Sequence, residues 1–284
     1  MSNNIFLKRG QMADKPNNTL WNGDCLELMQ DIPDKSMDAI ICDLPYGTTA
    51  CKWDIVIPFE PLWEQYKRII KYDGAIVLFG SEPFSSYLRL SNIKMYKYDW
   101  IWEKNFGGNP FTNKYQPSKE HEIISVFYKK HGTYNQQRIY RSLTSLKRDP
   151  IGTDRIIKRE STEIEHTNTK NTNFKISKDG KRNPRSIIKF NKIEKGTIND
   201  GYAHPTRKPL DLIKYLVKTY TNENDLVLDN TCGSNTTGIA CYDLNRNYIG
   251  IEKDIDIYNV AKKRVEKNIL LRANEQKGLF DELK

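Results

Sequence analysis

Short apolar runs of strand length alternate with segments of helical periodicity in two stretches of the chain, and this alternation constrains the fold more than any other feature. The runs are DAIIC at 38–42, AIVLFG at 75–80, DLVLD at 225–229 and YIGIE at 248–252. They are apolar on both alternating faces, as strands covered on both sides are. Because parallel neighbours need a crossover connection, strands that alternate with helices form a parallel sheet. We therefore predict an α/β fold with a doubly wound, mostly parallel sheet.

The segments between the runs have apolar residues at helical spacing. We expect helices over 58–71, 206–220, 236–244 and 257–272. Thr206 has a side chain suited to a helix N-cap, and Gly74 is expected to end the first helix. Two more strands are expected at 98–102 and 123–129, and the alternating Trp100 and Trp102 are interpreted as core residues rather than base-stacking ones.

The net charge of +9 is concentrated in one segment. Residues 129–200 contain 18 Lys and Arg against 8 Asp and Glu, whereas the rest of the chain contains 27 against 28. The segment is also rich in Asn, Thr and Ser and lacks apolar periodicity. Two interpretations stay open: a solvated insertion, or a surface that binds a polyanion such as nucleic acid, because Lys and Arg neutralise phosphates.

Several classes of protein are disfavoured by composition. No apolar stretch approaches the roughly 20 residues that cross a bilayer, and the N-terminus lacks the apolar core of a signal peptide. The five cysteines and four histidines show no metal-ligand spacing. We expect a cytoplasmic protein with reduced thiols, no metal site and no membrane partner, in which Cys42 and Cys241 pack in the core.

Polar residues follow the last two strands of the predicted sheet. The strand LVLD leads into NTCGSNTTG, where Gly233 permits a tight turn, and Glu252 ends the next strand, 19 residues beyond Gly233. A glycine turn paired with an acid at the following strand end suits a nucleoside, whose ribose hydroxyls donate to a carboxylate. The alternative is a helix-capping turn and a surface glutamate. A dinucleotide oxidoreductase is a rival, but CGSNTTG lacks its G-x-G-x-x-G pattern.

The first buried strand ends at Asp43 in the stretch CDLPYG, where Pro45 and Gly47 stiffen the turn that carries Tyr46. An ordinary Pro-Tyr turn would also explain these residues alone. However, CDLPYG, HPTRKPLDLI, LVLDNTCGSNTTGIA and NYIGIEKD in this order resemble the β-group of DNA amino-methyltransferases. The resemblance covers 20–128 and 202–268. The sequence departs from the family pattern at Leu44, which replaces the first proline of Asp-Pro-Pro-Tyr, and at Asn235, which replaces a glycine of the cofactor loop.

The resemblance implies S-adenosylmethionine as the cofactor, and it divides the chain. We expect a tail at 1–18, a catalytic half at 19–128, a basic target-recognition insertion at 129–200, a cofactor-binding half at 201–272 and a tail at 273–284. The resemblance implies that Asp24 contacts the adenine of the cofactor and that Cys25 lies beside it. It also implies that Thr206 and Lys208 approach the methionine carboxylate of the cofactor. The remaining residues implied to bind the cofactor are Asp229, Thr231, Gly233, Ser234, Asn235, Thr236, Thr237 and Glu252.

The same resemblance implies the reaction. Asp43 and the Leu44 carbonyl would accept the two N–H groups of an exocyclic amine, Pro45 would hold the turn, and Tyr46 would stack on a base extruded from the duplex. An acid-first tetrapeptide favours adenine N6, with cytosine N4 as the alternative. A catalytically silent DNA-binding protein and an RNA substrate also stay open.

Double-stranded DNA is the expected partner, and a homodimer and a cognate restriction endonuclease are left open. Arg can pair bidentately with guanine. The candidates for base contacts in the basic insertion are Arg138, Arg141, Arg182 and Arg185.

Overall fold

The computed structural model describes residues 18–48, 54–107, 113–148, 156–157, 174–175, 179–191 and 207–282. These residues form two compact units. The larger unit contains the described residues up to Asn135 and from Ser186 onward, and the smaller unit contains those between Gln136 and Arg185. No helix in the described ranges has both the length and the apolar composition of a membrane-spanning segment.

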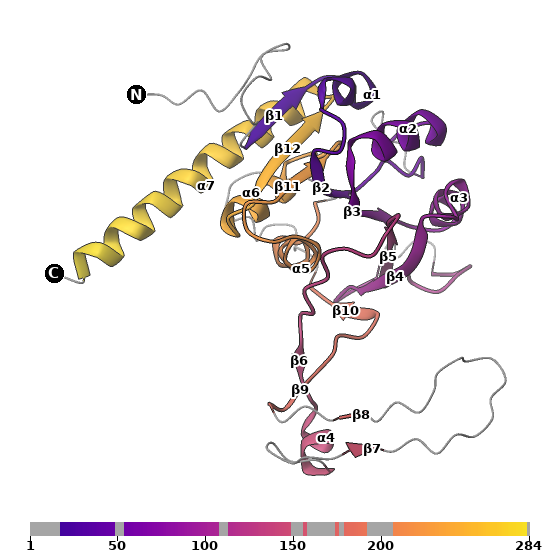
Figure 1. Cartoon of the computed structure of the whole chain (residues 1–284), viewed down its shortest axis with the longest axis vertical. Helices are drawn as coiled ribbons and strands as arrows, with labels where there is room; N and C mark the ends of the chain where they lie inside the picture. Colours follow the sequence, from indigo (N-terminus) through magenta and orange to yellow (C-terminus); the bar gives the residue numbers. More distant parts are fainter. Residues whose placement is uncertain are drawn as a thin grey trace. The chain divides into compact units, whose positions relative to one another are not determined.

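The larger unit alternates strands and helices along most of its length (Figure 1). Its strands are β1 (Thr19–Asn22), β2 (Met37–Cys42), β3 (Ile70–Gly80), β4 (Tyr96–Glu103), β5 (His121–Phe127), β10 (Ile187–Lys189), β11 (Leu226–Asp229) and β12 (Asn247–Glu252). Its helices are α1 (Cys25–Leu28), the 3-10 turn η1 (Met29–Asp31), α2 (Phe59–Ile69), α3 (Phe84–Ser91), α5 (Leu210–Tyr220), α6 (Thr236–Asp243) and α7 (Ile255–Glu282).

These eight strands form one sheet in the order β1-β12-β11-β2-β3-β5-β4-β10. Among them β5 alone runs against its neighbours, because its pairings with β3 and β4 are antiparallel and the other pairings are parallel. The predicted α/β fold with a mostly parallel sheet is therefore confirmed. The carboxyl ends of seven of the eight strands lie at one edge of the sheet.

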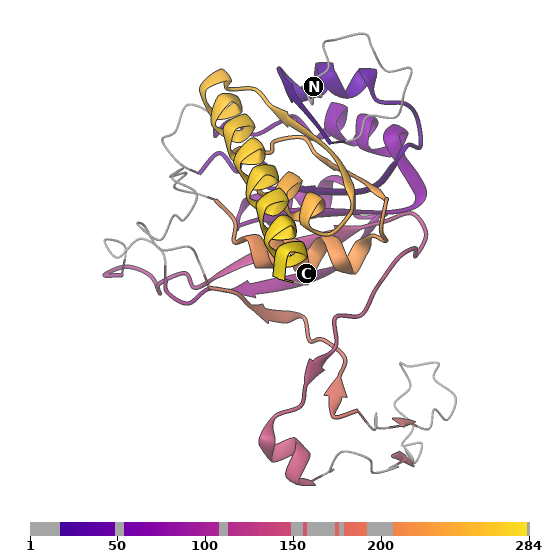
Figure 2. The same cartoon turned by 90° about the vertical axis from the view of Figure 1, so that its left-hand side faces the viewer.

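Helices cover both faces of the sheet. Helices α1, α2 and α3 pack on one face, where Ile40, Leu78 and Ile249 belong to the same buried cluster as Leu62 and Tyr66 of α2. Helices α5 and α6 pack on the other face, in a second buried cluster that includes the predicted core residues Trp100, Trp102 and Cys241. The first part of α7 adds Ala261 to a small cluster on β1, and Figure 2 shows α7 crossing in front of the sheet.

Three boundaries differ from the sequence-based expectations. Gly74 does not end α2, which stops at Ile69. It lies inside β3, and a side chain there would meet the Asp38 carbonyl oxygen at 2.8 Å, so glycine serves a close approach of two strands. The N-cap position of α5 is Pro209, and the expected cap Thr206 lies outside the described residues. Helix α7 continues to Glu282 instead of ending at 272, because no glycine or proline interrupts the pattern until Gly278, and the helix continues through that residue as well.

The described part of the smaller unit consists of short elements: α4 (Leu143–Arg148) and the strand pairs β6 (Ile139–Tyr140) with β9 (Lys181–Arg182) and β7 (Ile156–Ile157) with β8 (Phe174–Lys175). Two-stranded ribbons of this length are marginal on their own. Arg138 ties two parts of the unit together through a bidentate ion pair with Asp179 and a bond to the Lys181 carbonyl oxygen.

Candidate active site

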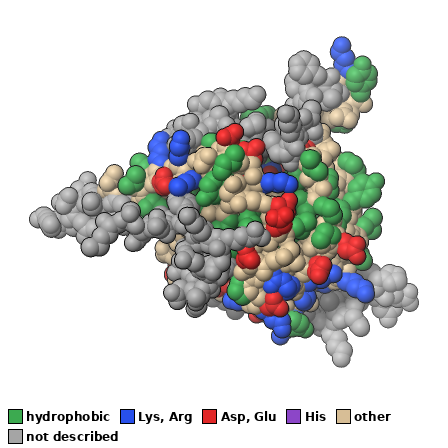
Figure 3. Space-filling view, turned by 90° about the horizontal axis from the view of Figure 1, so that it is seen from above, with side chains coloured by type: hydrophobic (Ala, Val, Ile, Leu, Met, Phe, Trp, Pro, Cys, Tyr) green, Lys and Arg blue, Asp and Glu red, His purple; other side chains and the backbone are tan. Residues whose placement is uncertain are grey.

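The sheet edge at the carboxyl ends of the parallel strands collects the acidic residues singled out in the sequence. Asp24 follows β1, Glu252 ends β12, Asp229 ends β11 and Asp43 follows β2. On the face of the molecule seen in Figure 3, acidic and basic side chains lie next to one another rather than in separate fields. An edge of this kind is the usual ligand site of open α/β sheets.

The point at which the crossover direction reverses lies between β11 and β2. The helix after β2 covers one face and the helix after β11 covers the other. In open α/β sheets ligands bind beside such a reversal point. Thr231 bridges them, because its hydroxyl donates to the Asp43 carbonyl oxygen at 3.0 Å and lies 2.9 Å from the Cys42 sulfur. The proposed catalytic turn and the proposed cofactor loop therefore meet directly.

The cofactor loop after β11 is shaped by two residues with left-handed backbone. Gly233 has φ 53°, and a side chain added there would point into open space. Asn235 has φ 58°, which Asn tolerates better than other non-glycine residues. Its side chain is fully buried and caps α6 by accepting a bond from the Gly238 amide at 3.0 Å. The replacement of the usual glycine by Asn235 therefore places its side chain under the helix, away from the open side of the loop.

A buried arginine that the sequence reading missed supports this loop. Arg264, on α7, is 4% exposed and donates to the Ser234 carbonyl oxygen at 2.6 Å, to the Ser234 hydroxyl at 3.0 Å and to the Thr236 hydroxyl at 3.2 Å. The hydroxyls of Ser234 and Thr236 are thus held by protein. Only the spacing Val260, Ala261, Arg264 and Val265 on the apolar face of α7 hinted at an inward-facing cation.

Asp229 is the most buried carboxylate of the edge, with an exposure of 6%. It accepts a bond from the Thr237 hydroxyl at 2.6 Å and one from the Thr231 amide at 3.3 Å. Burial raises the pKa of Asp229 to about 7, and these neutral donors offset only part of that increase. Asp229 therefore changes charge near neutral pH.

The outer two acidic residues of the edge are held differently. Glu252 accepts the Gly233 amide at 3.0 Å and the Asp254 amide at 2.8 Å, and burial raises its pKa. Asp24 caps α1 through the Leu26 amide and pairs with Lys253 at 3.0 Å. Burial acts to raise the pKa of Asp24, but these two partners lower it overall. Cys25, next to Asp24, is buried at 8% exposure and is a neutral thiol, because burial raises its pKa.

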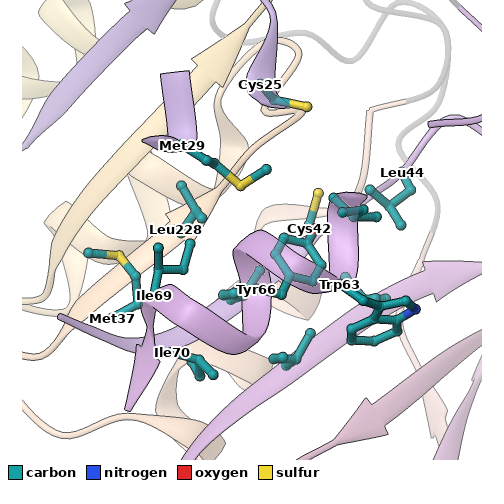
Figure 4. Packing of buried hydrophobic residues seen from close by; sticks show 14 of the residues in the cluster. Cys25, Met29, Met37, Cys42, Leu44, Trp63, Tyr66, Ile69, Ile70 and Leu228 are labelled. Carbon is teal, nitrogen blue, oxygen red and sulfur yellow. The ribbon is translucent and has the colours of Figure 1, made fainter. Parts of the chain in front are cut away.

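The catalytic turn is built on the core. Leu44 is 3% exposed and belongs to the buried cluster drawn in Figure 4, which also contains Cys42, Trp63 and Tyr66. The buried Leu44 side chain anchors the turn in place of the rigidity that proline gives. Tyr46 is half-buried, and its ring packs against that of Phe84, tilted by 30° with the centroids 5.1 Å apart. Its hydroxyl donates to Asp43 Oδ1 at 2.6 Å.

Lys208 lies beside the carboxylate of Asp43. Its Nζ is 2.5 Å from Asp43 Oδ2 and 3.3 Å from Glu122 Oε2, and Lys104 pairs with Glu122 Oε1 at 2.5 Å. Within the described residues Lys208 pairs with Asp43 and Glu122, and Thr206 lies outside them, so the approach of both to a methionine carboxylate stays a prediction. Glu122 and Lys104 were not identified from the sequence, because only the antiparallel direction of β5 brings Glu122 to this edge.

The four arginines proposed to contact bases lie in the smaller unit. Arg185 is exposed, Arg182 is half-buried and Arg138 is paired with Asp179. Arg141 is buried, with an exposure of 9%, which does not suit a direct base contact. Base recognition by this unit stays a prediction.

A family model described as DNA methylase, of the N6/N4 type, matches residues 37–263. The chain belongs to this family of DNA methyltransferases. The resemblance found in the sequence is thereby confirmed, and the match includes both β2 and β11.

Named relatives of this DNA methyltransferase cover most of its length. The Type II methyltransferase M.HinfI of Haemophilus influenzae is 29% identical over 87% of this chain and 68% of its own length. M2.MboI of Moraxella bovis is 26% identical over 93% of both chains. The DNA adenine methyltransferase YhdJ of Escherichia coli K12 is 26% identical over 87% of this chain and 82% of its own.

Solved structures support the same fold. M1.HpyAVI, determined as a complex with S-adenosylmethionine, superposes with a TM-score of 0.57 at 24% identity and covers 87% of this chain and 98% of its own. The cytosine-N4-specific PvuII DNA methyltransferase gives 0.60 at 15% identity, over 92% and 88% of the two chains. The cofactor of the first neighbour agrees with the one predicted here from the sequence.

Proposed function

We propose that this DNA methyltransferase transfers the methyl group of S-adenosylmethionine to the exocyclic amine of a base extruded from double-stranded DNA, with adenine N6 as the acceptor. The single observation that carries the proposal is the position of Asp43 and Tyr46. They lie at the reversal point of the sheet, and Thr231 joins them to a loop suited to a nucleoside. The acid-first tetrapeptide favours adenine over cytosine.

The residues of the edge fit the proposed cofactor. Each oxygen of Glu252 accepts one backbone amide, and a carboxylate oxygen has two lone pairs, so acceptor capacity remains for ribose hydroxyls. The open space over Gly233 lets a ligand approach the backbone closely. Bound at this edge, S-adenosylmethionine supplies an electrophilic methyl group on a sulfonium centre.

The chain's own residues prepare the acceptor. The amine of adenine is a weak nucleophile because its lone pair is delocalised into the ring. The Asp43 carboxylate would accept one N–H and the Leu44 carbonyl the other, which favours a pyramidal nitrogen with a localised lone pair. Tyr46 would stack on the extruded base, and its own ring is fixed by Phe84. Most of the acceleration then comes from orientation and preorganised dipoles.

Replacing Asp43 tests this function. Asp43→Ala and Asp43→Asn should abolish methylation, while calorimetric affinity for S-adenosylmethionine is kept, because Asp43 acts on the amine. The assay uses DNA and labelled cofactor and identifies the modified nucleoside. Turnover near that of the wild-type protein in either variant would refute the mechanism. If the product is N4-methylcytosine, the target base is cytosine and not adenine, and the roles proposed for Asp43 and Leu44 are unchanged.

A further inference from the structure

Both oxygens of the Asp43 carboxylate already have partners. Tyr46 donates to Oδ1 at 2.6 Å and the Lys208 ammonium lies 2.5 Å from Oδ2. Each oxygen keeps a second lone pair, but the ammonium neutralises part of the negative charge that would attract an N–H group. Lys208 therefore favours the ionised form of Asp43 but makes its carboxylate less available to the amine of a base.

Lys208 has a second carboxylate within reach. Its Nζ lies between Asp43 Oδ2 and Glu122 Oε2, at 2.5 Å and 3.3 Å, and the rings of Phe79 and Tyr46 flank it with centroids at 5.2 Å and 5.7 Å. The Lys208 side chain is only 10% exposed. Burial acts to lower its pKa, but the two carboxylates raise it overall, so the group stays charged.

Glu122 is fixed in a position to receive this ammonium. Lys104 holds Oε1 at 2.5 Å, and Oε2 is buried without a hydrogen bond of its own. The side chains of Glu122 and Lys104 are 15% and 12% exposed. Burial acts to raise the pKa of Glu122, but Lys208 and Lys104 lower it overall, so the carboxylate is ionised at neutral pH.

We propose that Glu122 is a positioning residue that takes over Lys208 from Asp43 when the target base enters. This inference rests on the proposed function of Asp43. Asp43, Glu122, Lys208 and Lys104 together carry no net charge, and moving the ammonium toward Glu122 keeps every buried charge paired. Without Glu122, releasing Asp43 would leave a buried ammonium unpaired, which is costly.

The charges around Asp43 give this role a distinct pH signature. Burial raises the pKa of Asp43 most, Glu122 raises it further and Lys208 opposes both. Asp43 must be ionised to accept an N–H. Neutralising Glu122 therefore lowers the pKa of Asp43, and the acid limb of the rate profile moves to lower pH. Neutralising Lys208 moves it to higher pH. Cys42, Asp229 and Tyr46 are the other titratable groups that interact with Asp43, and they are unchanged in both variants.

The test measures single-turnover methylation against pH at saturating DNA and S-adenosylmethionine. Glu122→Gln keeps the shape and the acceptor oxygen but removes the charge. We expect the rate on the plateau to fall about ten- to hundredfold, the range for losing a bond to a charged group. The acid limb should move to lower pH and cofactor affinity should be kept, whereas the melting temperature should fall, because the buried Lys104 loses the charge of its partner. Glu103→Gln is the matched control, since Glu103 also pairs with a lysine, Lys189, but at the exposed end of β4.

A double variant separates positioning from a structural role. In a Lys208→Gln background there is no ammonium to take over, so Glu122→Gln should slow the reaction no further, and Lys208→Gln alone should move the acid limb up. Equal slowing by Glu122→Gln in both backgrounds would overturn the proposal, as would an unmoved acid limb in Lys208→Gln. Retained turnover in Asp43→Ala would instead refute the proposed function, so the two failures are distinguishable.

Discussion

Three acidic residues of the sheet edge, Asp229, Glu252 and Asp43, differ in the partners of their carboxylates, while the fourth, Asp24, combines a backbone amide with an ion pair to Lys253. At the cofactor loop, Asp229 and Glu252 accept only neutral donors, which are hydroxyls and backbone amides. At the catalytic turn, Asp43 is paired with a buried lysine, and that lysine is shared with Glu122. Hydroxyl donors could therefore bind Asp229 and Glu252 without breaking an ion pair, whereas under the proposed mechanism Asp43 would exchange its ion pair for an amine.

This difference shows how one sheet edge can serve two ligands. A carboxylate with neutral partners is preorganised for a neutral ligand, and its own desolvation is the main electrostatic cost. A cationic partner favours the ionised form of a carboxylate, but it also makes the carboxylate oxygens less available to a ligand. Variants of Asp229 and Glu252 change the first kind of carboxylate without touching the second.

The largest expected effect concerns Asp229 and the stability of the fold. Its pKa is about 7 in the folded protein, against 3.8 in the unfolded chain, so the folded state binds more protons between these values. The stabilisation is complete below the unfolded pKa and is lost as pH rises through 7, at about 1.4 kcal/mol per pH unit. Urea unfolding from pH 5 to 8 should show this decline in the wild-type protein and a smaller one in Asp229→Asn, where Glu252 and Asp43 still have raised pKa values.

Asp256→Asn, at the exposed start of α7, is the control and should leave the decline unchanged. If Asp229→Asn shows the same decline as the wild-type protein, Asp229 is ionised from pH 5 to 8, and its hydroxyl and amide donors offset the whole effect of burial.

A smaller effect is expected at Glu252. Glu252→Ala should weaken binding of S-adenosylmethionine by about 1 to 3 kcal/mol, because it removes a charged acceptor. Isothermal titration calorimetry measures the change, with Glu103→Ala as the control for a glutamate at the end of another strand. Unchanged affinity for S-adenosylmethionine would show that Glu252 does not bind the cofactor. Asp229 would then be the one carboxylate with neutral partners left to compare with Asp43.

The smallest effects are expected for variants in the smaller unit. If Arg185 or Arg182 contacts a phosphate, replacing either by alanine should flatten the dependence of log K on log salt by about 0.9. Arg141→Ala should lower stability rather than change the salt slope, because Arg141 is buried. Fluorescence anisotropy at several salt concentrations measures the slope. An unchanged slope in Arg185→Ala and Arg182→Ala would indicate that the contacts to DNA lie elsewhere.

The cofactor loop was more predictable from sequence than the catalytic surroundings, for a physical reason. The bond between Gly233 and Glu252 follows from adjacent parallel strands whose spacing along the chain is regular. Lys208 and Glu122, by contrast, reach Asp43 from α5 and β5, and their approach depends on the order and direction of strands that periodicity does not reveal. Gly74 was misassigned because a glycine after a helical pattern usually marks its end, whereas here strand packing requires it.

The pairing of β1 with β12 has a consequence for synthesis of the protein. The first described strand of the chain completes the sheet only beside the last one, and Asn22 bonds the Glu252 carbonyl oxygen across 230 positions. A ribosome-bound chain therefore contains the catalytic turn long before its cofactor edge can form, since contacts so distant in sequence close late. The sheet edge that carries Glu252 is therefore absent from any chain whose synthesis stops before β12.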